Sequence, residues 1–184
     1  TEMSFEDYNK MALEVKNVGC IPMATPFDEK SVDTCMKLGF EIIKIASSDA
    51  NDWPLIEKVA ETGKPVIVSN GGLSEKDLDD LVKFFEKRKI PLSINHCVSL
   101  YPSEDSDIML DQIDYLRERY PNNLIGFSSH EKNDWSNSIL ISYAKGARTW
   151  ERHIDLDYEG EEWKGKNVSP YCSRPEDINT WFEA

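Results

Sequence analysis

The sequence has few basic residues for its acidic ones and no long hydrophobic run. It contains 21 Lys and Arg residues against 34 Asp and Glu residues, which gives a net charge of -13. This charge repels the phosphates of nucleic acids and anionic membranes. No apolar run approaches the roughly 20 residues of a membrane span, and the opening TEMSFEDYNK lacks the basic and apolar parts of a signal peptide. We therefore expect a cytoplasmic protein with neither a nucleic-acid nor a membrane partner.

Cysteine and histidine are also scarce. The cysteines are widely separated and lack the paired spacing of a zinc knuckle or a redox motif, which favours reduced and mostly buried thiols at Cys20, Cys35, Cys97 and Cys172. The chain has only three histidines, and each closes an apolar run: His96, His130 and His153. Their position at the ends of runs makes them candidates for a functional role.

Apolar, strand-like runs alternate with segments of helical periodicity along the chain. The runs cover residues 19–24, 41–46, 65–69, 91–97, 123–127 and 148–153. This alternation is typical of parallel α/β architecture, either a doubly wound sheet or most of a (β/α)8 barrel. A complete barrel usually takes about 250 residues, so the chain is about two units short. No linker or change of composition divides it, and we expect one domain over residues 1–184.

Polar residues close these runs, and in both architectures ligands bind at the carboxyl ends of the strands. Lys44 lies within the apolar run IIKI, where a buried ammonium group needs a carboxylate or an anionic ligand. A structural ion pair is an equally good interpretation. Ser69 begins the turn SNGG before a predicted helix, which is either a phosphate-binding turn or simply a tight turn.

Two of the histidines close successive runs. Neighbouring parallel strands lie about 4.8 Å apart, so His130 and His153 could bind one divalent cation together. Water, substrate oxygens or a carboxylate such as Glu151 would complete a site suited to Mn, Fe, Co or Zn. For each histidine taken singly a structural role is the alternative, and for His96 that role is favoured.

Six segments, in this order and spacing, resemble the sialic acid synthase family, which includes N-acetylneuraminate synthase and related synthases of spore-coat and surface polysaccharides. They are TPFD (25–28), KIASSD (44–49), GKPVIVS (63–69), HCVSLYP (96–102), GFSSH (126–130) and GARTWERH (146–153). The sequence also departs from the family. Ser129 stands where relatives usually have Asp, Glu131 replaces a common Thr, and the segment after His153 lacks the usual Gly-x-Asp.

The resemblance implies an incomplete (β/α)8 TIM barrel of about six β/α units, without its first two strands and without the small C-terminal antifreeze-like domain of relatives. It implies a carbon–carbon bond-forming transferase that condenses phosphoenolpyruvate with an N-acylmannosamine-type aldose to a sialic-acid-like nonulosonic acid and releases phosphate. It further implies a divalent metal, commonly Mn2+, and a homodimer.

The sequence leaves open whether this chain is active alone. Two alternatives also stay open: another phosphoenolpyruvate-dependent aldol synthase, and a barrel remnant that binds a sugar phosphate or a partner protein without turnover.

The same resemblance assigns roles to individual residues. The catalytic group is Lys44, Asp49, His130 and His153, of which His130 and His153 are the metal ligands. The substrate-binding group is Thr25, Ser47, Ser69, Ser99, Tyr101, Ser128 and, as a substitute for the missing acid, Glu162.

Overall fold

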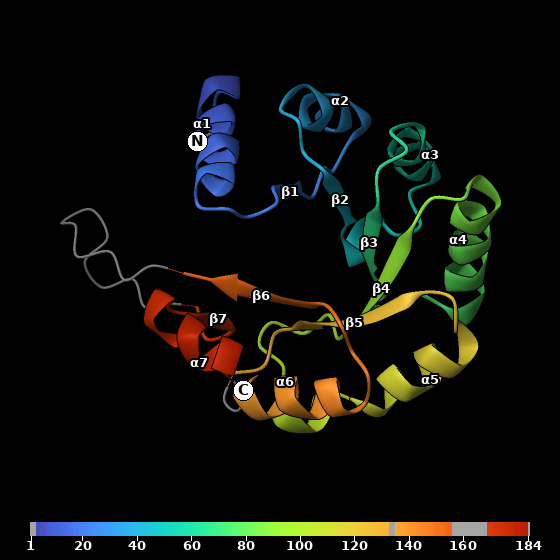
Figure 1. Cartoon of the computed structure of the whole chain (residues 1–184). Coiled ribbons are helices and arrows are strands. Elements are labelled where there is room, and N and C mark those ends of the chain that lie inside the picture. Colours follow the sequence, from blue (N-terminus) through green and yellow to red (C-terminus); the bar gives the residue numbers. More distant parts are fainter. Residues whose placement is uncertain (1–2, 133–134, 156–168, 184) are drawn as a thin grey trace. The chain divides into compact units, whose positions relative to one another are not determined.

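The computed structural model describes residues 3–132, 135–155 and 169–183. Two compact units, Thr1–Ser93 and Ile94–Ala184, follow one another along the chain. In each unit strands alternate with helices, and the strands follow chain order, β1-β2-β3 in the first and β4-β5-β6-β7 in the second (Figure 1). The single domain expected over residues 1–184 stays a prediction.

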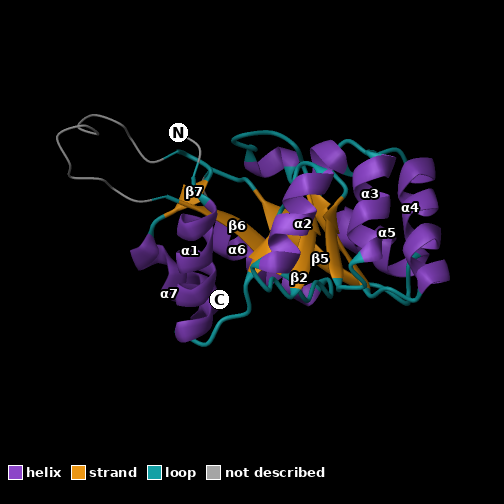
Figure 2. Ribbon diagram, turned by 90° about the horizontal axis from the view of Figure 1, so that it is seen from above, coloured by secondary structure: helices purple, strands orange, loops and turns teal. Residues whose placement is uncertain are grey.

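From residue 3 onward, where the structure describes it, the first unit contains four helices, one short 3-10 turn and the strands that they connect. Its elements are α1 (Phe5–Asn17), β1 (Met23–Ala24), α2 (Glu29–Lys37), β2 (Ile42–Ile45), η1 (Ser47–Asp49), α3 (Trp53–Glu61), β3 (Val66–Ser69) and α4 (Glu75–Arg88). Strand β2 pairs in parallel with both β1 and β3. Figure 2 shows α2, α3 and α4 lying along the strands.

The second unit continues the alternation. Strand β4 (Leu92–Cys97) begins at the boundary between the units, and the elements after it are η2 (Asp105–Asp107), α5 (Asp111–Arg119), β5 (Leu124–Ser129), α6 (Trp135–Ala144), β6 (Trp150–Ile154), β7 (Cys172–Ser173), η4 (Pro175–Asp177) and α7 (Ile178–Glu183). Strand β6 pairs in parallel with both β5 and β7.

The helices begin and pack as their sequences predict. Ser4 forms a capping box with Asp7 at the start of α1, and Ser74 accepts a hydrogen bond from the Asp77 backbone at the start of α4. The apolar stripe of α4 is buried at Leu78, Leu81, Val82 and Phe85. This burial against the strands, more than helix propensity, stabilises such a helix.

Three strand predictions need correction. Strand β1 is shorter than the predicted 19–24, because Gly19 adopts a positive φ of 83° as the chain leaves α1 and Pro22 has no N–H to donate. Strand β5 runs to Ser129, beyond the predicted end at residue 127, because its pairing with β6 continues across both serines. The two-residue β7 was not predicted at all.

Other expectations concern the cysteines and membrane spans. The four cysteines all lie within the described residues, and none forms a disulfide bond. Cys20 is exposed and Cys172 half-buried, so only Cys35 and Cys97 are buried as expected. Over the described ranges the structure contains no helix with both the length and the apolar character needed to cross a membrane.

Candidate functional site

The carboxyl ends of β5 and β6 bring together the polar residues that the sequence placed after apolar runs. The parallel register aligns Ser128 with Glu151 and Ser129 with Arg152. Because side chains alternate between the two faces of a strand, Ser128 and Glu151 share one face while Ser129 and Arg152 share the other. The next residues along the two segments are His130 and His153.

The imidazoles of His130 and His153 lie next to each other. Their ring centroids are 5.2 Å apart and the ring planes are inclined by 42°. His130 is buried, whereas His153 is exposed. The structure therefore brings together the two histidines that the sequence predicted to meet, with one ring held by the protein and the other accessible from solvent.

A backbone hydrogen bond orients His130. Its Nδ1 lies 3.1 Å from the carbonyl oxygen of Val98, so that nitrogen carries the proton and donates it. Burial lowers the pKa of His130 below its ordinary value, and the Val98 hydrogen bond opposes this only in part. The neutral ring therefore keeps Nε2 free of a proton, which is the tautomer that a metal ligand requires.

Two tyrosines surround the imidazoles. The Tyr101 ring centroid lies 4.1 Å from that of His130 and 6.0 Å from that of His153. Tyr171 meets both Tyr101 and His153 edge to face at 5.4 Å. The pKa of Tyr101 is raised, mainly by partial burial and to a smaller extent by the nearby Cys97 and Glu151. Its hydroxyl therefore keeps its proton and can donate a hydrogen bond to a ligand.

A serine and a carboxylate meet on the same face of the strands as the imidazoles. Ser128 is buried, and its Oγ donates to Glu151 Oε1 at 3.1 Å. Glu151 is half-buried. This pair adds an acceptor and a negative charge beside the two rings.

The first unit holds a second group of predicted site residues. Lys44 is buried, with Nζ donating to the Ile45 carbonyl at 3.2 Å. Ser69 is also buried, and within the described residues its Oγ has no hydrogen-bond partner. An unsatisfied buried hydroxyl is uncommon in folded proteins. An anionic ligand at the end of β3 would satisfy it.

The turn after β3 is tied to the turn after β2. The Ser47 Oγ accepts a hydrogen bond from the Gly71 backbone at 3.1 Å, and Gly72 adopts a φ of 78°. Asp49 is half-buried and accepts from the Ser48 hydroxyl at 2.6 Å. The structure thus brings Ser47 to the turn that follows Ser69.

For two of the remaining predicted site residues the structure shows how far each is buried. Thr25 is half-buried after β1, and Ser99 is exposed after β4. Glu162 lies outside the described residues. The prediction that Lys44 lies near the two imidazoles also stays a prediction, because Lys44 belongs to the first unit and the imidazoles to the second.

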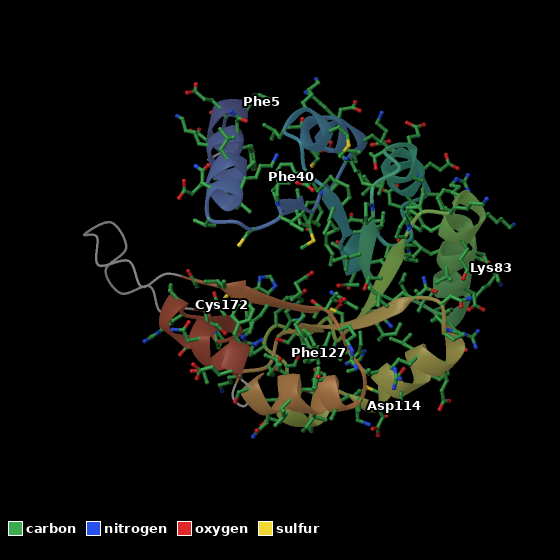
Figure 3. All side chains as sticks on the ribbon, viewed as in Figure 1. Phe5, Phe40, Lys83, Asp114, Phe127 and Cys172 are labelled. Carbon is green, nitrogen blue, oxygen red and sulfur yellow. The ribbon has the colours of Figure 1, made fainter. Side chains whose placement is uncertain are left out.

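His96 has the structural role that the sequence favoured. It is buried, its Nε2 lies 2.7 Å from the Ile108 carbonyl, and its ring stacks on Phe127, which is labelled in Figure 3. Phe127 and Ser129 lie on the same face of β5, opposite to that of Ser128. His96 therefore contacts the face of β5 that does not carry Ser128.

Sequence reasoning missed two side chains beside these strands. Tyr171 follows the region outside the described residues, and no motif pointed to it. Arg152 was quoted only as part of a motif, yet its side chain is 3% exposed and bonds to β5 and β7. Polar residues spaced by two at a strand end, such as Ser129 and Glu131, are the signal that could have suggested a polar second face.

The described residues offer two imidazoles to a metal rather than a complete ligand set. Among them, no group of three or more His, Cys, Asp and Glu side chains is placed to hold a metal ion. A cation held by His130 and His153 would therefore take its other ligands from water or substrate, as catalytic metal sites commonly do.

Comparisons with known proteins point in one direction. The pattern of the NeuB family matches residues 1–170. The N-acetylneuraminate-9-phosphate synthase of Drosophila melanogaster is 35% identical over 160 residues, which are 85% of this chain and 42% of that protein. The chain spans about half the length of the curated relatives it matches.

Solved structures agree with this match. A putative spore coat polysaccharide biosynthesis protein E from Chromobacterium violaceum ATCC 12472 is 37% identical with a TM-score of 0.92, covering all of this chain and 53% of that one. The N-acetylneuraminic acid synthetase from Leptospira borgpetersenii, solved in complex with citrate, is 29% identical with a TM-score of 0.85, covering 99% of this chain and 62% of that one. The expected α/β fold class of TIM-barrel type is thereby confirmed.

Proposed function

Because the chain belongs to the NeuB family, we propose that this protein condenses phosphoenolpyruvate with an N-acylmannosamine-type aldose, releasing phosphate and forming a sialic-acid-like nonulosonic acid. The observation that carries the proposal is the pair of adjacent imidazoles at the ends of β5 and β6, with ring centroids 5.2 Å apart. A proposed homodimer and a cytoplasmic location follow from the same resemblance. Light scattering of the purified protein tests the first of these.

In this proposal His130 and His153 hold a divalent cation, with Mn2+ the first candidate. The residues fit such an ion, because the Val98 carbonyl accepts the Nδ1 proton of His130 and leaves Nε2 as a ligand. When bound, the ion supplies Lewis-acid polarisation of the open-chain aldehyde. Tyr101, whose hydroxyl keeps its proton, would orient the sugar beside the two rings.

The first unit would bind phosphoenolpyruvate. Lys44 supplies a buried positive charge. The Ser69 hydroxyl, which has no partner in the described part of the chain, supplies a donor for the phosphate or the carboxylate. Ser47, whose Oγ accepts a hydrogen bond from the Gly71 backbone, links the turn after β2 to the turn after Ser69. Fixed cationic and hydroxyl groups of this kind orient a reactant and stabilise charge that develops during the reaction.

The reaction balances with these groups. C3 of phosphoenolpyruvate forms a bond to the aldehyde carbon, whose oxygen takes up a proton, and C2 becomes electron-poor. Water adds at C2, and the resulting tetrahedral intermediate loses phosphate to give the keto acid. Asp49 is assigned to accept a proton from that water, since it is a half-buried carboxylate in the turn after β2.

A turnover assay tests the reaction. Phosphate release should require phosphoenolpyruvate, N-acetylmannosamine and Mn2+ together. Release with a different aldose in place of N-acetylmannosamine would identify another phosphoenolpyruvate-dependent aldol synthase instead. Binding of phosphoenolpyruvate without turnover under any of these conditions would favour a binding protein.

Calorimetry with Mn2+ tests the metal ligands separately, since both lie in the second unit. His130→Ala and His153→Ala should each abolish measurable Mn2+ binding, because one imidazole alone is a weak ligand. His96→Gln is the matched control, since His96 is buried but bonded to the Ile108 carbonyl, and it should keep the wild-type affinity. Unchanged affinity in either alanine variant would reject the assignment of that histidine.

A further inference from the structure

Behind the two imidazoles, on the other face of β5 and β6, lies a buried ion pair. The Arg152 and Glu131 side chains are 3% and 0% exposed, and Arg152 Nη1 lies 3.6 Å from Glu131 Oε2. Arg152 directly precedes His153, and Glu131 directly follows His130. The two charges therefore sit next in sequence to the two candidate metal ligands.

The guanidinium of Arg152 makes three hydrogen bonds to two other segments of the chain. Its Nη2 donates to the backbone carbonyl of Glu131 at 3.2 Å, and its Nη1 donates to the Ser129 hydroxyl at 3.2 Å. Its Nε donates to the hydroxyl of Ser173 in β7. These bonds fix the positions of β5, β6 and β7 relative to one another at the residues on both sides of His130.

The Glu131 carboxylate is held from a further element. Its Oε1 accepts a hydrogen bond from Ser138 of α6. Its backbone forms an isolated parallel bridge with Ser103, whose N–H donates to the His130 carbonyl at 2.9 Å. The segment that carries His130 is therefore bonded on both sides, although it lies beyond the end of β5.

A buried ion pair is a poor way to gain stability. Removing two charges from water costs about as much as their attraction returns, and an apolar pair of similar volume is often as stable. Burial indeed lowers the pKa of Arg152, while the Glu131 charge opposes that shift. Directional bonds from one planar guanidinium to several fixed acceptors give geometric precision that apolar packing lacks.

We propose that Arg152 and Glu131 are positioning residues, which hold His130 and His153 at the separation and orientation needed for one cation. This inference rests on the proposed function for its purpose, but the geometry that it describes exists without a metal. Two of the three departures from the family noted in the sequence, Ser129 and Glu131, are both bonded to Arg152. Residues that support metal ligands in this way typically change metal affinity by about 10–100-fold.

The test replaces both charges together, because removal of one leaves the other buried without its partner. In the double variant Arg152→Met, Glu131→Gln the new side-chain amide can still accept from Ser138, and neither charge of the pair remains. We expect Mn2+ to bind about 10–100-fold more weakly. Lys145→Met is the matched control, since Lys145 bridges Asp111 and Asp114 of α5 and its loss should leave Mn2+ affinity unchanged.

A second measurement requires no metal. Long-range proton–nitrogen NMR spectra of the metal-free protein report which ring nitrogen of His130 carries its proton. The wild type and Lys145→Met should show the Nδ1–H tautomer alone, as the Val98 hydrogen bond requires. The double variant should show a mixture of tautomers or exchange-broadened His130 and His153 signals, because the ring is no longer held in register.

The outcomes separate this inference from the proposed function. A double variant with the wild-type tautomer and a Mn2+ affinity within about twofold of wild type, well below the expected loss, would overturn the inference. If the wild type binds no Mn2+, the metal proposal fails, and the tautomer measurement alone decides the positioning role. If the double variant does not fold, the variant Arg152→Lys is measured in its place. The single ammonium group of lysine cannot make all the hydrogen bonds of Arg152. An unchanged His130 tautomer together with an unchanged Mn2+ affinity in that variant would also overturn the inference.

Discussion

A methyl group added at Gly126 should destabilise the second unit strongly. Gly126 lies in the middle of β5, and its φ is outside the left-handed region. Its backbone conformation therefore does not require glycine, and the obstacle to a larger residue is the lack of room for a Cβ atom. An added Cβ would overlap the Thr149 hydroxyl and the Asn95 side chain, and would come within 2.6 Å of the Thr149 carbonyl oxygen. The last of these atoms belongs to the backbone and cannot rotate away.

The size of the effect follows from these contacts. Overpacking in a buried site costs about 1–3 kcal/mol, and three simultaneous overlaps place Gly126→Ala near the upper end of that range. The Thr149 hydroxyl also donates to Asn95 Oδ1 at 2.8 Å across this glycine, and displacing that bond adds about 1 kcal/mol. For a chain of this length each kcal/mol lowers Tm by about 2–4 °C, so a fall of about 6–12 °C is expected from overpacking alone.

Thermal and urea unfolding of the variant measure this effect. Gly63→Ala is the matched control, because Gly63 has a φ of 64° and nothing within 4 Å of an added Cβ, so its cost comes from backbone strain alone. Adding Thr149→Ala to Gly126→Ala should recover part of the loss, since one overlapping group is removed. A Gly126→Ala protein within ~0.5 kcal/mol of wild type would refute the close approach of Asn95 and Thr149 over Gly126.

Two further predictions use buried polar groups. Burial lowers the pKa of His96 below its ordinary 6.5, so the unfolded state takes up the proton first as pH falls. The stability advantage of wild type over His96→Gln should then be constant above about pH 6.5 and shrink as the pH falls below that value. A pH-independent difference in urea unfolding would contradict this prediction. Ser69→Ala should stabilise the fold slightly or leave it unchanged, because the Ser69 hydroxyl has no partner among the described residues, and should weaken phosphoenolpyruvate binding in calorimetry. Ser142→Ala, which removes bonds to Ile139 and Trp150, should instead lose about 1–3 kcal/mol in urea unfolding; equal stability changes in the two serine variants would contradict the prediction.

The order of strands and helices could be predicted from the sequence because it depends on local patterns. Each of the six apolar runs in the sequence overlaps a strand of the structure, and helices lie between these strands. The capping residues Ser4 and Ser74 stand at the starts of α1 and α4, as predicted. Strand ends were less accurate. The apolar pattern stops at Phe127, but parallel hydrogen bonding continues to Ser129, because backbone pairing does not depend on the side chains being apolar.

The candidate site was predictable only in part, for a related reason. Position at the end of a strand marked His130 and His153, and the structure places their rings together. Tyr171 could not be found, because its contacts with Tyr101 and His153 join residues far apart in the sequence. No local pattern relates Lys44 to the imidazoles either, since that relation depends on tertiary arrangement.

The alternation of side chains at the ends of β5 and β6 explains why one strand end serves two purposes. Ser128 and Glu151 share one face, while Ser129, Glu131 and Arg152 are bonded together on the other. A slip of β6 by one residue against β5 would move Glu151 to the face of Glu131 and Arg152 to the face of Ser128. It would separate the Arg152–Glu131 ion pair and bring the Glu151 carboxylate to the face of Glu131 without Arg152, and both changes oppose the slip. The ion pair therefore favours the single register in which the two imidazoles are neighbours, and its two charges are expected to tolerate replacement only together.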